Sequence, residues 1–202
     1  MAAPDVYPTA RGPLPRIAEP FAKRARERRH RRFVALVGAR PGMRIVDVGC
    51  GAVGLRGLGP DLDVTGVDIV GHPGYPGPLV VADAAAGLPF ADNEFDLAYC
   101  NSVIEHVPPE RRPAFAAELR RVARGWYVQT PARSFPIEPH SLLPGAHWLP
   151  AGLRARYWRL GAGGEPEDVS LLGRSEFEAL FGLAERERFG PFTKSWVSAR
   201  LP

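Results

Sequence analysis

Two short apolar runs each carry an acid in a position that could hold a ligand. Residues 45–51 read Ile-Val-Asp-Val-Gly-Cys-Gly, the pattern of a buried strand followed by glycines. Asp47 lies within this run, where a carboxylate is costly to bury unless it binds something. Gly49 and Gly51 allow a tight turn and bring bare backbone against a ligand. A second apolar run ends in Asp68, 21 residues after Asp47.

The distance between the two acids indicates a nucleotide. In a Rossmann-type unit, an acid about 20 residues beyond the glycine turn can hold the hydroxyl pair of a ribose. We therefore expect an adenosine-containing cofactor. Residues 49–54 also fit the G-x-G-x-x-G pattern of dinucleotide dehydrogenases, so this short match leaves NAD open as an alternative.

Five segments in order resemble the class I S-adenosylmethionine-dependent methyltransferases. They are the glycine turn, the second acid, residues 80–83 (Val-Val-Ala-Asp), residues 88–96 (Leu-Pro-Phe-Ala-Asp-Asn-Glu-Phe-Asp) and residues 97–107 (Leu-Ala-Tyr-Cys-Asn-Ser-Val-Ile-Glu-His-Val). The resemblance covers about residues 44–150. It implies an α/β, Rossmann-like methyltransferase fold, with a mostly parallel sheet and an antiparallel last strand. It also implies a methyltransferase that uses S-adenosyl-L-methionine as cofactor.

The resemblance assigns the cofactor to polar groups and glycines at the ends of the first four strands. Asp47 and the glycine turn would hold its amino acid end, and Asp68 the ribose hydroxyls. Asp83 would read the adenine, and Asn101 would face the methionine portion. For each Asp, the alternative is a helix cap or a turn former. The candidate cofactor-binding residues are Asp47, Gly49, Cys50, Gly51, Asp68, Ile69, Asp83, Ala84 and Asn101.

Two stretches depart from the pattern of the family. Residues 55–62 contain two glycines and a proline, which leaves room for at most a turn or two of the helix that usually follows the glycine turn. Residues 71–78 (Gly-His-Pro-Gly-Tyr-Pro-Gly-Pro) exclude a helix between the second and third strands. We therefore expect an extended crossover and a thinly covered sheet face, which the N-terminal helix or a second subunit could cover.

The segment after the fifth strand resembles a bacterial subset of the family that carries FPIEPH, LP and HWLP in succession. Four prolines between residues 136 and 150 predict a rigid lid, which we place at residues 131–165, rather than a helix. The aromatic residues of this segment suit a partly apolar acceptor.

The candidate catalytic residues are two histidines and a glutamate. His140 is a candidate general base because histidine titrates near neutral pH, and Glu138 would orient it. His106 follows the fourth strand at the carboxyl edge, where ligands bind in open α/β sheets. The alternative is that these side chains hold the lid in place. Glu138, His140 and His147 could also form a metal site, but no thiolate supports it and we assign no metal.

Other patterns predict the remaining elements. Glu19-Pro20 suits the start of a helix that ends at Val37. Apolar residues at helical spacing predict a helix over residues 109–122, and Ser175 to Glu178 read as a capping box that opens another. That last helix would bury Phe177, Leu180 and Phe181. The expected strands are residues 44–48, 64–68, 80–83, 97–101, 126–129, 183–189 and 194–201.

The charges divide the chain unevenly. Between Arg16 and Arg32 there are eight basic and two acidic residues, a net charge of +6, so the remainder sums to −2. We expect a loosely ordered arm at residues 1–16 and a single methyltransferase domain at residues 17–202, with an Arg-rich helix at residues 17–38. This helix could bind nucleic acid, although such a run is more often a solvated face. No run approaches the roughly 20 apolar residues of a membrane span, and no signal peptide is evident, so we expect a cytoplasmic, bacterial protein.

The favoured function is methyl transfer to oxygen or nitrogen of a small, partly apolar metabolite. One alternative is a nucleic-acid or protein methyltransferase that docks through the Arg-rich helix. Against it, residues 101–104 read Asn-Ser-Val-Ile and not the Asn/Asp-Pro-Pro-Tyr/Phe of amino-group nucleic-acid methylases. The other alternative is a non-catalytic homologue that binds the cofactor, which the shortened helix motivates. A homodimer is compatible with the sequence.

Overall fold

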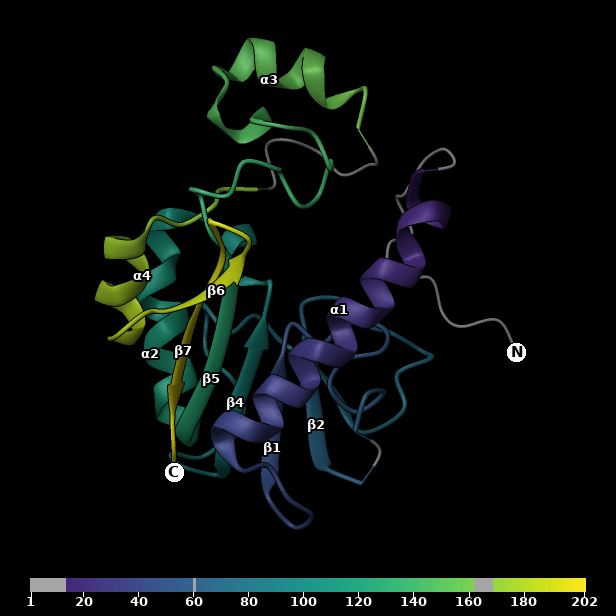
Figure 1. Ribbon diagram of the computed structural model, residues 1–202. Coiled ribbons are helices and arrows are strands. Elements are labelled where there is room, and N and C mark those ends of the chain that lie inside the picture. Colours follow the sequence, from purple (N-terminus) through teal and green to yellow (C-terminus); the bar gives the residue numbers. More distant parts are fainter. Residues whose placement is uncertain (1–13, 60, 162–168) are drawn as a thin grey trace.

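The computed structural model describes residues 14–59, 61–161 and 169–202 (Figure 1). Residues 1–13 of the expected N-terminal arm lie outside the described residues. Helix α1 (Leu14–Val37) begins five residues before the predicted start and includes residues 14–16, which the sequence assigned to the arm. Pro15 lies in its first turn, where a proline is tolerated because the missing N–H has no partner there.

Seven strands of the described chain form one sheet in the order β3-β2-β1-β4-β5-β7-β6. The first five are parallel to one another, and β7 runs antiparallel to β5 and β6. This confirms the predicted fold class and the antiparallel last strand. The strands are β1 (Arg44–Val48), β2 (Asp63–Asp68), β3 (Leu79–Val81), β4 (Phe95–Asn101), β5 (Ala123–Pro131), β6 (Glu185–Phe189) and β7 (Phe192–Arg200).

Helices cover both faces of this sheet. Successive residues of a strand point to opposite faces, so Ile45 packs in the core on one side and Val46 in the core on the other. Helices α2 (Arg112–Val122) and α4 (Arg174–Phe181) lie on the Val46 side, and α1 lies on the Ile45 side (Figure 1). The buried strands are therefore apolar on both faces, as parallel strands usually are.

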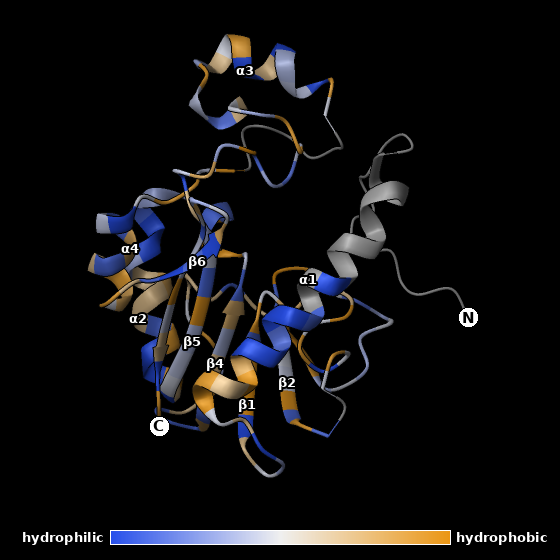
Figure 2. Cartoon of the chain, viewed as in Figure 1, coloured by the Kyte–Doolittle hydropathy of each residue, from blue (hydrophilic) through white to orange (hydrophobic). Residues whose placement is uncertain are grey.

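The C-terminal part of α1 covers the centre of its sheet face. The ring of Phe33 meets Tyr99 of β4 edge-on at 4.9 Å and Tyr127 of β5 at 5.3 Å. Figure 2 shows this helix hydrophilic along its middle and hydrophobic at its last turns. At the β3 edge Val81 is still 60% exposed, so α1 does not cover that part of the sheet. The crossover before β3 is free of helix, as predicted.

The capping box expected at Ser175 is wrong. Helix α4 begins at Arg174, after Gly173, and the structure records no side-chain cap there. Glu178 accepts a hydrogen bond from Nε of Arg174 at 2.9 Å, so its carboxylate does not reach back to the helix start as a capping box requires. The predicted burial of Phe177, Leu180 and Phe181 is confirmed.

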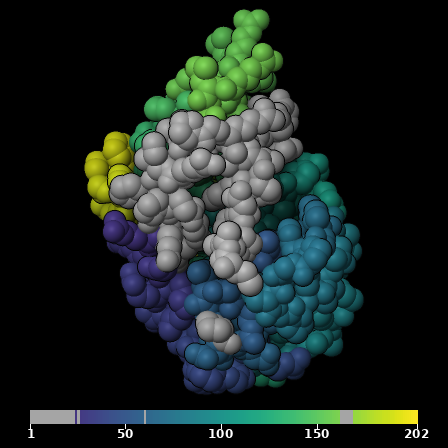
Figure 3. Space-filling view, turned by 90° about the vertical axis from the view of Figure 1, so that its right-hand side faces the viewer, coloured from purple at the N-terminus to yellow at the C-terminus, as the bar shows by residue number. Residues whose placement is uncertain are grey.

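The lid contains a helix that the prolines did not predict. Up to Pro150 the chain forms turns and the 3-10 turn η3 (Ala146–Trp148), and then α3 (Ala151–Trp158) begins directly after that proline. Proline suits a helix start because its fixed φ fits the first turn. Trp158 packs with Ala146, Val169 and Leu171 in a small cluster separate from the main core. Figure 3 shows the lid as a protrusion at one end of the molecule.

Among the described residues, none of the helices has the length and apolar character needed to cross a membrane.

Candidate functional site

The glycine turn after β1 is fixed against the end of β2. The N–H groups of Gly49 and Cys50 donate to the carbonyl of Val67 at 2.8 and 3.1 Å. Gly49 has φ +77°, and a Cβ there would lie 2.2 Å from Cγ2 of Val103. Gly51 has φ +58°, and a Cβ there would meet nothing within 4 Å. Gly49 is therefore required by the packing, whereas Gly51 leaves open space that a ligand can approach.

Asp47 lies beneath this turn. It is 2% exposed, and its Oδ2 accepts a hydrogen bond from the N–H of Leu55 at 2.6 Å. A Cβ on Gly54 would lie 2.6 Å from the same oxygen, so the chain crosses directly over the carboxylate. Burial raises the pKa of Asp47 to about 7, and the negative charge of Asp68 acts in the same direction. Asp47 thus anchors residues 54–55, and its contact with a cofactor stays a prediction.

Asp68 joins the glycine turn to the loop after β2. Its Oδ2 accepts from the N–H of Gly51 at 2.8 Å, and its Oδ1 accepts from the N–H of Val70 at 3.1 Å. His72 Nε2 lies 3.4 Å from the same Oδ2. The carboxylate therefore stands at the open side of the turn, and the side chain of Ile69 beside it is 70% exposed.

Asp83 has a partner that the sequence did not reveal. Its Oδ2 lies 2.8 Å from Nη2 of Arg111, and its Oδ1 accepts from the N–H of Ala85. Burial would raise the pKa of Asp83, but the hydrogen bonds from Arg111 and Ala85 outweigh it and hold the pKa below its ordinary value. Ala84, the residue that follows Asp83, is buried. Arg111 lies in the 3-10 turn η2 (Pro109–Arg111), 28 residues away, and no short motif connects it to Asp83.

Asn101, the last residue of β4, has an unpaired acceptor. Its Oδ1 is buried and has no hydrogen-bond partner within the described chain. Leaving a buried acceptor unpaired costs about 1–3 kcal/mol, which a ligand that donates a hydrogen bond would recover. Together with the open space at Gly51 and the carboxylate of Asp68, this atom fits the ammonium and hydroxyl donors of S-adenosylmethionine.

Four side chains gather beside this edge, two from the turn after β4 and two from the lid. Glu105 and His106 belong to the 3-10 turn η1 (Ile104–His106). Nδ1 of His140 lies 2.7 Å from Oε1 of the fully buried Glu138, and the rings of His106 and His140 are 4.9 Å apart. The hydroxyl of Thr130 donates to Oε2 of Glu105 at 2.9 Å. We refer to Glu105, His106, Glu138 and His140 as the His–Glu cluster.

The carboxylates and imidazoles of this cluster influence one another's pKa values. Burial raises the pKa of Glu105, and the two nearby histidines only partly oppose it. Burial would also raise the pKa of Glu138, but its hydrogen bond with His140 holds the pKa below the ordinary value. For His140, burial would lower the pKa, yet Glu138 and then Glu105 raise it overall. The structure therefore brings together all three candidate catalytic residues and adds Glu105, which the sequence did not single out.

His147 lies apart from the His–Glu cluster. Its Nε2 is 3.0 Å from the carbonyl oxygen of Arg133, and its ring packs against Trp148 at 4.8 Å. Trp148 Nε1 donates to the same carbonyl. The alternative metal set of Glu138, His140 and His147 is therefore not assembled in this structure.

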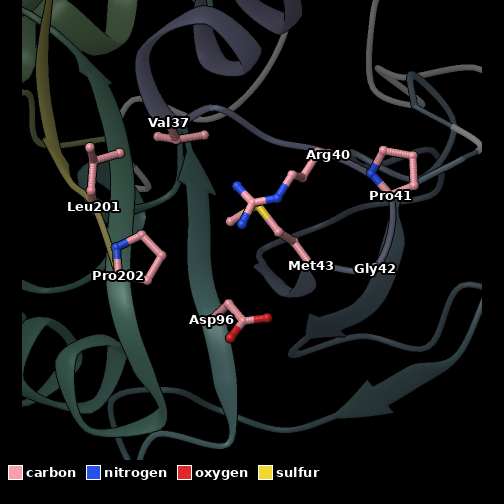
Figure 4. Close-up of a pocket in the computed structure, with 8 residues that line it drawn as sticks. All are labelled: Val37, Arg40, Pro41, Gly42, Met43, Asp96, Leu201 and Pro202. Carbon is pink, nitrogen blue, oxygen red and sulfur yellow. The ribbon is translucent and has the colours of Figure 1, made fainter.

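A cavity of about 490 Å³ lies at the opposite edge of the sheet (Figure 4). It forms where α1 ends and where β1 and β4 begin. The carboxyl ends of the parallel strands, where the predicted site residues lie, face away from it. We therefore do not assign it to the site. Its lining residues are Val37, Arg40, Pro41, Gly42, Met43, Asp96, Leu201 and Pro202.

Comparison with known proteins gives a family match and a shared fold. Residues 46–125 match the family described as "Methyltransferase domain". An "Uncharacterized methyltransferase" of Mycobacterium marinum (strain ATCC BAA-535 / M) is 38% identical over 89 residues, which are 44% of this chain and 33% of that protein. The match therefore spans only a third of the relative.

Solved structures share the fold at low sequence identity. A protein of Pyrococcus horikoshii OT3 matches with a TM-score of 0.58 at 17% identity, covering 84% of this chain and 85% of the other. A SAM-dependent methyltransferase of Archaeoglobus fulgidus gives 0.56 at 20% identity, with 86% and 76% covered. The 1,6-didemethyltoxoflavin-N1-methyltransferase of Burkholderia thailandensis gives 0.56 at 14% identity, with 84% and 74% covered.

Proposed function

We propose that this chain, which carries a class I methyltransferase domain of the S-adenosylmethionine-dependent type, transfers a methyl group to an oxygen or nitrogen atom of a small, partly apolar molecule. One observation carries the proposal. The glycine turn, Asp68 and the unpaired Oδ1 of Asn101 lie at the same sheet edge as the His–Glu cluster, because Glu105 follows Asn101 by only four residues. The proposed cofactor site would therefore be adjacent to a group able to accept a proton.

The cofactor would lie against the glycine turn and the strand ends that the sequence singled out. The backbone from Gly49 to Gly51 would receive the amino acid portion, and Oδ1 of Asn101 would accept a hydrogen bond from it. Asp68 would bind the ribose hydroxyls, and Asp83 and Ala84 would lie beside the adenine. When bound, S-adenosylmethionine supplies a methyl group on a cationic sulfur. The protein must then align an acceptor with that methyl group and remove the acceptor's proton.

His140 is the proposed general base. Nδ1 of its ring is hydrogen-bonded to Glu138, which leaves Nε2 to take a proton from the hydroxyl or amine of the acceptor. Glu138 fixes the orientation of the ring and stabilises the imidazolium that forms. A base of this kind contributes about 10²- to 10⁴-fold to a rate. His106, whose ring lies 4.9 Å from that of His140, would lie beside the acceptor.

Named relatives of this fold support a small acceptor. The Burkholderia structure contains 1,6-didemethyltoxoflavin with S-adenosylhomocysteine, and another similar structure (TM-score 0.55, 15% identity) is a magnesium protoporphyrin IX methyltransferase of Synechocystis PCC 6803. In the present chain the acceptor would bind between the sheet edge and the lid; among the aromatic residues of the lid, Phe135 is buried and Trp148 is 53% exposed. Apolar walls with a few convergent polar groups are typical of small-molecule sites.

The test is methyl transfer from S-adenosylmethionine with an isotopically labelled methyl group to panels of phenols, carboxylates and amines, with a chelator present. We expect His140→Ala to lower turnover at least 100-fold on any acceptor found, while the affinity for S-adenosylhomocysteine stays within about twofold. His147→Ala is the matched control, since that histidine lies outside the cluster. Unchanged turnover in His140→Ala would remove it as the base. Transfer to RNA or protein alone would replace the small-molecule proposal by the alternative that uses the Arg-rich helix.

A further inference from the structure

The structure places two imidazoles and a carboxylate around one point, and we propose that Glu105, His106 and His140 bind a divalent transition-metal cation, best matched by Zn²⁺. One ligand atom from each residue lies within 4.8 Å of those of the other two. Two imidazoles and a carboxylate, without thiolate, form a ligand set found in catalytic zinc sites, where water or substrate completes the coordination.

The separation of these atoms is close to what a tetrahedral ion needs. Zinc bonds to imidazole nitrogen and carboxylate oxygen are about 2.0–2.2 Å long, so neighbouring ligand atoms stand roughly 3.3 Å apart. The three groups therefore have to approach by no more than about 1.5 Å. His106 is exposed on the short turn η1. Glu105 and His140 are held by hydrogen bonds with Thr130 and Glu138.

Glu105 and His140 have the hydrogen-bond partners that usually orient metal ligands in proteins. Glu138, which is fully buried, binds Nδ1 of His140 and leaves Nε2 for an ion. Histidine ligands usually donate their other N–H to a carboxylate in this way, which fixes the tautomer and the ring. Thr130 donates to Oε2 of Glu105 and so orients the second ligand.

Glu105 supplies an independent observation. It is 1% exposed, and its Oε1 is buried with no hydrogen-bond partner in the described chain. A buried carboxylate oxygen without a partner is costly, and a cation would satisfy it. When the histidines are neutral, as ligands must be, Glu105 and Glu138 together carry a formal charge of −2, which one divalent cation balances.

Metal binding and the proposed base role exclude each other. Both use the lone pair on Nε2 of His140, so a bound cation prevents this nitrogen from accepting a proton. We therefore expect stoichiometric Zn²⁺ to inhibit any transfer that depends on His140, and a chelator to restore it. The inference about the site itself does not depend on methyl transfer, because the cation is measured without cofactor or acceptor.

The test uses the untagged full chain after treatment with a chelator. Zn²⁺ is titrated by calorimetry, and Co²⁺ is titrated by visible absorption, which reports four-coordinate geometry. We expect one ion per chain and a Co²⁺ spectrum of a four-coordinate site. His106→Ala and Glu105→Gln should weaken binding by more than 100-fold, and Glu138→Gln by about 10- to 100-fold, as for other outer partners of a ligand. His147→Ala should bind as the wild type does.

Each outcome decides the proposal. If Glu105→Gln fails to fold, as shown by circular dichroism, the exposed His106→Ala carries the test alone. Absence of stoichiometric binding, or binding that His106→Ala leaves unchanged, would overturn the metal site. Binding of S-adenosylhomocysteine by the same preparation separates the two proposals, since either ligand can bind when the other does not.

Discussion

Asp47 shows how a single buried residue can fix the chain beside the candidate site. Its carboxylate is buried under residues 54–55 and accepts the N–H of Leu55 at 2.6 Å. The sequence identified this acid by its place in an apolar strand, and the structure gives it the task of holding the shortened segment that follows the glycine turn. The described residues of that segment, 55–59 and 61–62, form turns and no helix, within the turn or two of helix that its glycines and proline allowed.

The raised pKa of Asp47 predicts that stability depends on pH. Its pKa is about 7 in the folded chain and 3.8 in the unfolded chain, so the folded state holds the proton more tightly. Stability must then fall as the pH rises from about 4 to about 7 and level off above that. Between about pH 5 and about pH 8 the loss from this group is roughly 2–3 kcal/mol.

Asp47→Asn should remove this part of the pH dependence, because the amide oxygen can still accept from Leu55 but does not titrate. Urea unfolding of both proteins at the two pH values measures the difference. An equal loss of stability in the wild type and in Asp47→Asn would show that another group is responsible.

The two glycines of the turn give a second prediction at this scale. Gly49→Ala should destabilise the fold by roughly 2–4 kcal/mol, because φ is positive and the new Cβ would overlap Val103. Gly51→Ala has the same backbone cost but no overlap, so about 1–2 kcal/mol is expected. Thermal unfolding of both variants compares them, and equal losses would contradict the packing account.

Among the elements, α2 has a buried charge at its start. Arg112 is 2% exposed and forms an ion pair with Glu176 of α4. It also donates to the carbonyls of Val107 and Ser170. The guanidinium of Arg112 therefore joins the start of α2 to three other segments: the residue after η1, the chain beyond the lid, and α4. Since Glu105 and His106 belong to η1, these contacts connect the His–Glu cluster to the helices on that face of the sheet.

Arg112→Leu should cost about 3–5 kcal/mol, because the two carbonyls lose a buried partner and Glu176 loses its cation. Arg124→Leu is the control. Its side chain is 62% exposed and pairs with Asp96 at 3.4 Å, so a change within about 1 kcal/mol is expected. Denaturant unfolding measures both, and similar losses would show that the buried network contributes little.

The elements also show how far the sequence could lead. Strands and the helix-free crossover were predictable because short continuous apolar runs and prolines act locally. The capping box failed because Glu178 pairs with Arg174, a competition that the four-residue pattern does not contain. Helix α3 was missed because prolines were taken to exclude a helix, although Pro150 immediately precedes one.

For the site, the strand-end acids and both histidines were predictable because carboxyl ends of parallel strands meet at one edge. The partners that define their environment were not, since Arg111, Thr130 and the unpaired oxygen of Glu105 depend on contacts between distant segments. The 33 residues between His106 and His140 include the irregular start of the lid, and no periodic pattern fixes how that start returns over the sheet.

At the scale of the whole molecule, the two edges of the sheet differ in kind. The carboxyl edge carries the glycine turn, Asp68, Asn101 and the His–Glu cluster, whereas the amino edge carries the cavity beside Arg40 (Figure 4). The central claim is that an adenosyl cofactor binds at the carboxyl edge. Calorimetric titration with S-adenosylhomocysteine is the most direct measurement of that claim.

We predict that one molecule of S-adenosylhomocysteine binds per chain. Asp68→Asn should bind it about 10- to 100-fold more weakly, because the ribose hydroxyls lose hydrogen bonds to a charged acceptor. Arg40→Ala, at the opposite edge, should bind it as the wild type does. If the wild type shows no association, or if Arg40→Ala weakens binding and Asp68→Asn does not, the assignment of the site is contradicted.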